Sequence, residues 1–387
     1  MRYCILNNKI KNITLDTISR FTGIFPLVLS MCVCAGIGTI AGVIFACIAI
    51  LLSAGFEQKK MMPVYTSFLI AVYTFKVYGP SALSAAVIFC GIMMVISAPA
   101  YKKINEYFRS PAIPSAMLAT ALSVTVLFTT DYFGIGATGE IPKTMIESYL
   151  SLGFHPNWRG VLYGTIVMVI MITFPRKFKN VCKILNASFL GLTVTVLLNL
   201  WLNPSDMITA IKEVGAFSFT DYKDTFILPL ASHPSAVLNG IMCGFALYFT
   251  VFYSLSLTSA DKKDYILCGT ANATLGFVSC GFIPSVINKK NYVSSFAAAI
   301  LTGLFAFIFK DFIARIPVHS CAVIIIVGAW NSVKWSELKN IFKNTKGIAC
   351  LAAVISGYLL TGSVYGTLIA VVISFLYVRI FNSKSKV

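Results

Sequence analysis

Residues 347–377 read GIACLAAVISGYLLTGSVYGTLIAVVISFLY, a stretch that contains no charged side chain. One helical crossing of a bilayer takes about 20 residues, so the stretch is too long for one crossing and long enough for two. We therefore predict two membrane helices, over residues 347–362 and 365–381. Hydrocarbon offers no hydrogen bonds to the backbone, so only helices and closed barrels cross it, and continuous apolar runs indicate helices.

Comparable apolar runs recur along the rest of the chain. Of the 387 residues, 57% are hydrophobic and 12% are charged, and that charged fraction is about half of what soluble domains carry. Two shorter apolar segments begin at Pro63 and near Ser285. We predict an all-α polytopic membrane protein of about fourteen segments, and the ten further long ones cover residues 23–37, 38–54, 80–99, 111–129, 160–175, 184–202, 236–258, 265–282, 297–314 and 317–333.

The net charge of +17 follows the predicted topology. Lys and Arg are about three times as frequent in the strips on the side of the amino terminus as in the opposite strips, which predicts that both termini are cytoplasmic. This placement forms no groove that would suit nucleic acid, so we predict no nucleic-acid partner. The expected partners are membrane lipid and a small solute. A homodimer with a second copy of the chain is a further option. We expect the protein in the cell (inner) membrane.

Catalytic and metal-binding patterns are lacking in the sequence. It contains no H-E-x-x-H, G-x-S-x-G or P-loop motif, so we predict neither enzyme activity nor a cofactor. The cysteines fall mostly inside apolar runs, where Cys behaves as a small hydrophobic residue. We assign no function to His155, His233 and His319, which lie near the ends of predicted segments.

The segments divide into two sets of seven, residues 1–202 and 236–387, joined by a predicted outer loop, 203–235. An odd number of crossings per set gives the two sets opposite orientations, which is typical of inverted repeats in secondary transporters. Each set has an interrupted third segment, at Pro63 and at Ser285. Paired interruptions of this kind mark substrate sites near the bilayer midplane, because the amino termini of half-helices present free N–H groups to an anion.

Several motifs in this order resemble the sulfate permease (SulP) family of anion transporters. The first span, Phe25-Pro26-Leu27-Val28-Leu29-Ser30-Met31-Cys32-Val33-Cys34-Ala35-Gly36, resembles the family's I-P-Q-A-M-A-Y-A-L-L-A-G, and Met62-Pro63 resembles the G-P that opens its third helix. Gly269-Thr270-Ala271-Asn272 with Gly276 and Gly281-Phe282 resembles G-L-A-N…G…G-F, and Ile316-Pro317 through Gly328 and Trp335-Ser336-Glu337-Leu338 resembles I-P…V-G…W-x-E-L.

The resemblance implies a seven-plus-seven inverted repeat with core and gate subdomains and with segments 3 and 10 as half-helices. The family's C-terminal cytoplasmic STAS domain is not found in this sequence. Tyr253 stands where proton-coupled members have a membrane carboxylate, and Lys289 and Lys290 stand where the family has a Ser-Arg pair.

The expected substrate-binding residues come from both arguments. The half-helices place backbone amides and two lysines at the site, and the resemblance adds residues of the first and eighth helices. The set is Phe25, Pro26, Pro63, Val64, Tyr65, Tyr253, Ser285, Val286, Ile287, Asn288, Lys289 and Lys290.

These observations predict a secondary transporter for a small inorganic or organic anion of the sulfate, bicarbonate, chloride or dicarboxylate class. No acidic residue lies inside a predicted span, and proton or sodium relays normally use one there, so exchange or uniport is favoured over proton symport. Three alternatives stay open: a nucleobase permease of the same fold, a passive anion channel, and a membrane sensor or scaffold that transports nothing.

Overall fold

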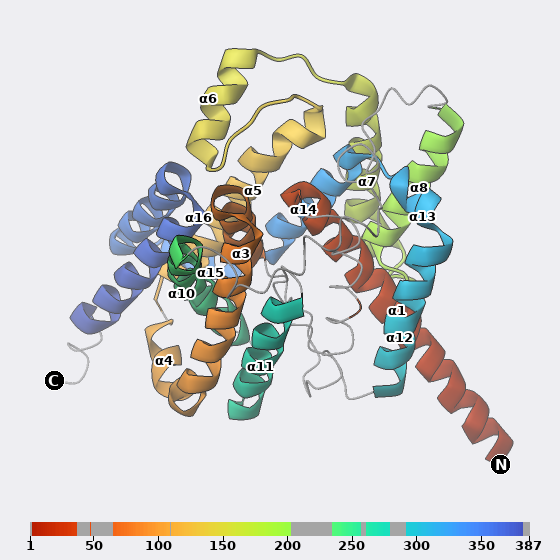
Figure 1. Ribbon diagram of the computed structural model, residues 1–387, viewed down its shortest axis with the longest axis horizontal. Helices are drawn as coiled ribbons and strands as arrows, with labels where there is room; N and C mark the ends of the chain where they lie inside the picture. Colours follow the sequence, from red (N-terminus) through yellow and green to blue (C-terminus); the bar gives the residue numbers. More distant parts are fainter. Residues whose placement is uncertain are drawn as a thin grey trace.

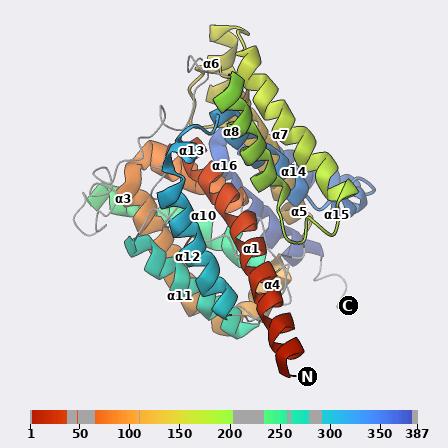
Figure 2. The same ribbon diagram turned by 90° about the vertical axis from the view of Figure 1, so that its right-hand side faces the viewer.

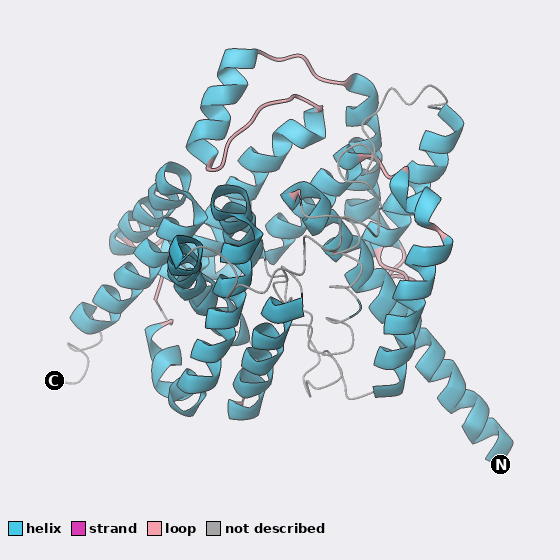
Figure 3. Ribbon diagram, in the orientation of Figure 1, coloured by secondary structure: helices cyan, strands magenta, loops and turns pink. Residues whose placement is uncertain are grey.

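The structure, a computed structural model, is a bundle of helices (Figures 1 and 3). It describes residues 2–36, 47, 65–108, 110–202, 234–256, 261–278 and 292–381. No strand occurs in these ranges, so the predicted all-α class is confirmed. The helices are α1 (Arg2–Ala35), α3 (Tyr65–Ser97), the 3-10 turn η1 (Ala98–Ala100), α4 (Tyr101–Tyr107), α5 (Ala112–Phe133), α6 (Pro142–Leu152), α7 (Trp158–Lys177), α8 (Ala187–Leu202), α10 (Pro234–Ser256), α11 (Lys262–Val278), α12 (Tyr292–Ile308), α13 (Lys310–Ala314), α14 (Val318–Ser332), α15 (Trp335–Ile341) and α16 (Thr345–Phe381).

Six of the described helices are long and apolar enough to cross a membrane, or seven if the bent pair α14 and α15 counts as one span. Most predicted segments coincide with a helix to within a few residues, as for 160–175 in α7 and 317–333 in α14. The prediction of a multi-pass membrane protein is therefore confirmed. The predicted total of fourteen segments depends in part on residues 38–54 and on the short segment that begins near Ser285. Both lie largely outside the described residues.

Two of the long helices are broken at a glycine. The backbone of Gly79 in α3 has φ 84° and ψ 177°, and that of Gly362 in α16 has φ 84° and ψ 179°. Side chains other than that of glycine rarely adopt such a positive φ. The breaks lie where the sequence predicted the boundaries before residues 80–99 and after residues 347–362.

The break in α16 produces a helical hairpin. The Tyr358 hydroxyl in the first arm and the Thr367 hydroxyl in the second arm lie 2.8 Å apart. A Cβ at Gly366 would stand 2.6 Å from the ring of Tyr358, so the two arms are in close contact. Each arm is about 26–28 Å long at 1.5 Å per residue, close to the hydrocarbon thickness of a bilayer.

The amino-terminal helix is longer than predicted. The sequence placed the first span at residues 23–37 after a polar strip, whereas α1 is one continuous helix from Arg2, about 51 Å long. The strip is helical because its charges pair locally: Arg20 Nε lies 3.1 Å from Asp16 Oδ2 in an i,i+4 ion pair, and the Ser294 hydroxyl of α12 donates to the same carboxylate. Figure 2 shows α1 running beside α12, with its first turns extending past the bundle.

The helices pack in two groups. In the first, the second arm of α3 lies against α10 and α11, and the second comprises α5, α7, α14 and α16. Small residues permit the close crossings of the first group, since a Cβ at Gly240 or Gly244 would stand 2.6 or 2.8 Å from a backbone oxygen of α3. Interfaces between membrane helices favour such residues because helix backbones can then approach closely.

The bundle has two distinguishable ends. α6 caps one end, and α4 lies at the other, where α1 begins and the chain ends (Figures 1 and 2). We refer to them as the α6 end and the α4 end. The chain passes from α4 through α5 to α6. In the predicted topology, the α4 end therefore carries the inner strips and the α6 end carries the outer strips.

Candidate functional site

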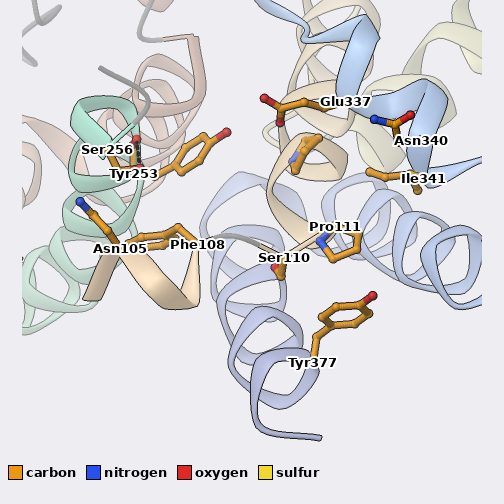
Figure 4. Close-up of a pocket in the computed structure, with 11 residues that line it drawn as sticks. Asn105, Phe108, Ser110, Pro111, Tyr253, Ser256, Glu337, Asn340, Ile341 and Tyr377 are labelled. Atoms are coloured by element: carbon orange, nitrogen blue, oxygen red, sulfur yellow. Dashed lines mark hydrogen bonds between the residues drawn. The ribbon is translucent and has the colours of Figure 1, made fainter. Parts of the chain in front are cut away.

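A cavity of about 510 Å³ opens at the α4 end. Figure 4 shows Asn105 of α4 and Tyr253 and Ser256 of α10 on one side, and Glu337 and Asn340 of α15 on the other. The remaining lining residues are Phe108, Ser110, Pro111, Pro114, Ile341 and Tyr377. Hydroxyl, amide and carboxylate groups therefore face a space that lies between the two helix groups.

Glu337 is the one charged residue that lines this cavity in the described chain. Its Oε1 lies 3.0 Å from Lys334 Nζ, three residues earlier on the turn before α15. Both side chains are about a third or more exposed, so the pair contributes little to stability, at most about 1 kcal/mol. Its effect on the cavity is electrostatic, because Lys334 offsets a negative charge that would repel an anion.

Tyr253 of α10 forms part of the wall of the cavity at the α4 end. The side chain is 7% exposed, and its hydroxyl lies 3.5 Å from the sulfur of Met117 on α5. The same tyrosine lines a second, small cavity of about 20 Å³, together with Met117, Thr250, Tyr358 and Thr367. Tyr253 thus lines both a large, polar space and a small, mostly apolar one.

One helical turn before Tyr253, a pair of hydroxyl groups joins α10 to the first turn of α3. Ser67 Oγ and Thr250 Oγ1 lie 3.1 Å apart, and both side chains are buried. The first arm of α3, as described from Tyr65 to Tyr78, is about 21 Å long, shorter than a bilayer crossing. The small cavity therefore ends beside the start of a short arm, the position that the sequence assigned to substrate.

Tyr65, a predicted site residue, lies at this start. A Cβ at Gly328 of α14 would overlap the Tyr65 hydroxyl, so the ring lies directly on the glycine. The contact joins the first helix group to the second. Tyr65 and Tyr253 are thus brought into one region by Ser67 and Thr250, while their roles in binding stay predictions.

Phe25 and Pro26 lie elsewhere, on α1. The ring of Phe25 is stacked on Phe21 at 5.4 Å and meets Phe305 of α12 edge-on at 5.5 Å. Phe25 therefore takes part in an aromatic cluster between α1 and α12, and Pro26 is buried in the same helix. Among the described residues, neither Phe25 nor Pro26 lines the cavity at the α4 end.

The other predicted site residues lie outside the described residues. They are Pro63, Val64, Ser285, Val286, Ile287, Asn288, Lys289 and Lys290. Their place at the site stays a prediction.

Sequence reasoning did not identify Ser67, Thr250, Glu337 and Asn340. Single hydroxyl residues in apolar helices give no signal of their own, because Ser and Thr commonly bond to the backbone of their own helix. Glu337 occurs in the Trp335–Leu338 motif that resembles the sulfate permeases, and its place between the predicted spans 317–333 and 347–362 could have suggested a cavity mouth.

Comparisons with known proteins give a consistent answer. No family model and no curated protein matches the sequence. Solved structures do match: the transmembrane domain of the cyanobacterium bicarbonate transporter BicA, at 15% identity over 94% of this chain and 97% of that one, has a TM-score of 0.66. The chain has the transmembrane fold of an anion transporter. SLC26A9 matches with a TM-score of 0.70 at 13% identity, over 95% of this chain and 65% of that one.

The murine Slc26a9 anion transporter in the inward-facing state gives a TM-score of 0.71 at 13% identity, over 95% of this chain and 68% of that one. This all-helical membrane fold is the one that the sulfate permease resemblance predicted, while its seven-plus-seven arrangement stays a prediction. The structures with this fold are transporters, in line with the prediction of a transporter rather than an enzyme.

Proposed function

We propose that the protein is a secondary transporter of a small anion that works by exchange or uniport with alternating access. The observation that carries the proposal is the polar cavity between the two helix groups, which ends at Tyr253 and leads toward the start of the short α3 arm. The similar structures support an anion as substrate, since their names describe a bicarbonate transporter and an anion transporter.

In this proposal the group of α3, α10 and α11 is the core subdomain, and the group of α5, α7, α14 and α16 is the gate. The anion would bind beside the start of the α3 arm and the segment that begins near Ser285, with Lys289 or Lys290 adding positive charge. The cavity at the α4 end would then be its route to the cytoplasm. Movement of one group against the other would close this route and open one at the α6 end.

Flux measurements test the proposal. In proteoliposomes, we expect saturable exchange of at least one of chloride, bicarbonate, sulfate and oxalate. Uptake should depend only weakly on a proton gradient, because the described acidic residues lie near helix ends or outside the long helices, except Asp16 of α1, whose carboxylate is paired with Arg20. A non-saturating current would instead indicate a channel, uptake of uracil a nucleobase permease, and no flux at all a sensor or scaffold.

A topology measurement tests the orientation. We expect reporters fused to Met1 and Val387 to give a cytoplasmic signal and a reporter at Gly139, between α5 and α6, to give an external one. The reason is the excess of basic residues at the α4 end. A cytoplasmic signal from Gly139 would contradict the proposed orientation and exchange the two routes.

A further inference from the structure

A second cavity, of about 330 Å³, lies at the α6 end. Lys76, near the end of the first α3 arm, and Asp131, in the last turn of α5, both line it. The first residue belongs to the proposed core and the second to the proposed gate. No ion pair within 4.0 Å joins the two side chains in the described structure, so a full positive and a full negative charge face one space from opposite helix groups.

Two helices end at this cavity. Gly36 follows α1 and Gly134 follows α5, both have a positive φ, of 76° and 67°, and both line the cavity. At Gly134 the left-handed backbone closes α5, with Ile135 N donating to Thr130 O at 2.9 Å. The carboxyl end of a helix carries about half a negative charge, so both ends add negative potential to that of Asp131.

His319 forms an immobile wall of the cavity. Its Nδ1 lies 3.2 Å from the backbone oxygen of Tyr132, and since a carbonyl only accepts, Nδ1 carries the proton. Nε2 is buried without a hydrogen-bond partner in the described structure, and the ring lies on Gly160, where a Cβ would overlap it. A charged ring would need a partner for its second N–H, so His319 offers the cavity no positive charge.

Only two described groups bring positive charge to this cavity. The amino end of α14, at Val318, contributes about half a positive charge. Lys76 is exposed and is the one full positive charge that lines the cavity among the described residues. Without it, Asp131 and the ends of α1 and α5 would leave the space negative and favour cations.

We propose that this cavity is the outer entrance of the anion pathway and that Lys76 determines its selectivity for anions. The lysine acts by offsetting most of the negative charge of Asp131 and the two helix ends, so that an anion entering from outside meets only weak repulsion. This inference rests on the proposed function and on the proposed orientation. In this inference, the charges at the entrance select anions over cations, and the proposed binding site at the start of the α3 arm keeps the role given to it above.

Charge variants measured from each side test it, with chloride-36 or sulfate-35 as the probe, whichever the wild type exchanges. Lys76→Gln should raise the KM for external anion about tenfold, the lower end of what a charged cleft does to local ion concentration, and should leave the KM for internal anion within twofold. Asp131→Asn should lower the external KM. The double variant should return close to the wild-type value because the balance is restored.

Lys143→Gln is the matched control, since Lys143 is an exposed lysine of α6 that does not line the cavity. A second arm uses Lys76→Cys with membrane-impermeant methanethiosulfonates added outside. A trimethylammonium reagent should restore the external KM, and a sulfonate reagent should raise it further, with the wild type treated in parallel.

The outcomes separate the two proposals. If the wild type exchanges neither anion nor any other tested, the proposed function fails. If it exchanges anions but Lys76→Gln leaves the external KM within twofold, or shifts both sides equally, the entrance proposal is overturned. A double variant as impaired as Lys76→Gln would overturn it too, because Lys76 would then act by direct contact and not by balance.

Discussion

The Gly91→Ala variant is expected to lose about 2 kcal/mol of stability and most of its yield as a folded, monodisperse protein. Gly91 of α3 lies where α11 crosses, and an added Cβ would overlap Ala273 N and stand 2.5 Å from Gly269 O. Both contacts are with backbone, which cannot rotate away, and overpacking in a tight interior costs about 1–3 kcal/mol. Alanine would gain up to about 1 kcal/mol in helix propensity, so the clash prevails.

Fluorescence-detected size exclusion and a melting curve in detergent would measure the effect. Gly303→Ala on α12 is the matched control, because among the described residues a Cβ there meets nothing closer than the sulfur of Cys47 at 4.0 Å. It should melt at or above the wild-type temperature. Equal melting of Gly91→Ala and the control would mean that α3 and α11 are farther apart than described.

The Gly328→Ala variant is expected to fold but to reduce transport at least tenfold. An alanine methyl group would overlap the Tyr65 hydroxyl and the ring carbon that carries it. Tyr65 is 4% exposed and has little room to move, so the methyl group must displace the start of the α3 arm from α14. A displacement of about 1 Å at a positioned site commonly costs a hundredfold in rate, and the lower figure allows for relaxation of the flexible ring.

The measurement is the initial rate of anion exchange in proteoliposomes at matched protein incorporation. Adding Tyr65→Ala to Gly328→Ala should restore the melting temperature, because it removes the ring that the methyl group meets. Gly303→Ala again serves as control and should transport at the wild-type rate. Transport by Gly328→Ala at more than half the wild-type rate would show that this contact has no part in the pathway.

The sequence alone determined the class and most of the segment boundaries. The charge-free run 347–377 required two crossings, and the structure breaks it at Gly362, the last residue of the first predicted crossing. These features were predictable because the bilayer imposes a length and an apolar composition on each crossing, and both are local properties of the chain. The sequence did not predict that the helix begins before residue 23, because hydropathy marks only apolar runs, and the ion pair of Asp16 and Arg20 forms only once the strip is a helix.

The polar positions were decided by tertiary structure. That Lys76 and Asp131 line one cavity with His319 depends on how α3, α5 and α14 meet. Ser67 and Thr250 likewise become a pair only where α3 crosses α10. Hydropathy fixes how many times a chain crosses the membrane, because each crossing exchanges water for hydrocarbon. It does not fix which faces of the helices meet, because lipid and apolar side chains are nearly equivalent surroundings, and close packing at glycines such as Gly91 and Gly328 makes that choice.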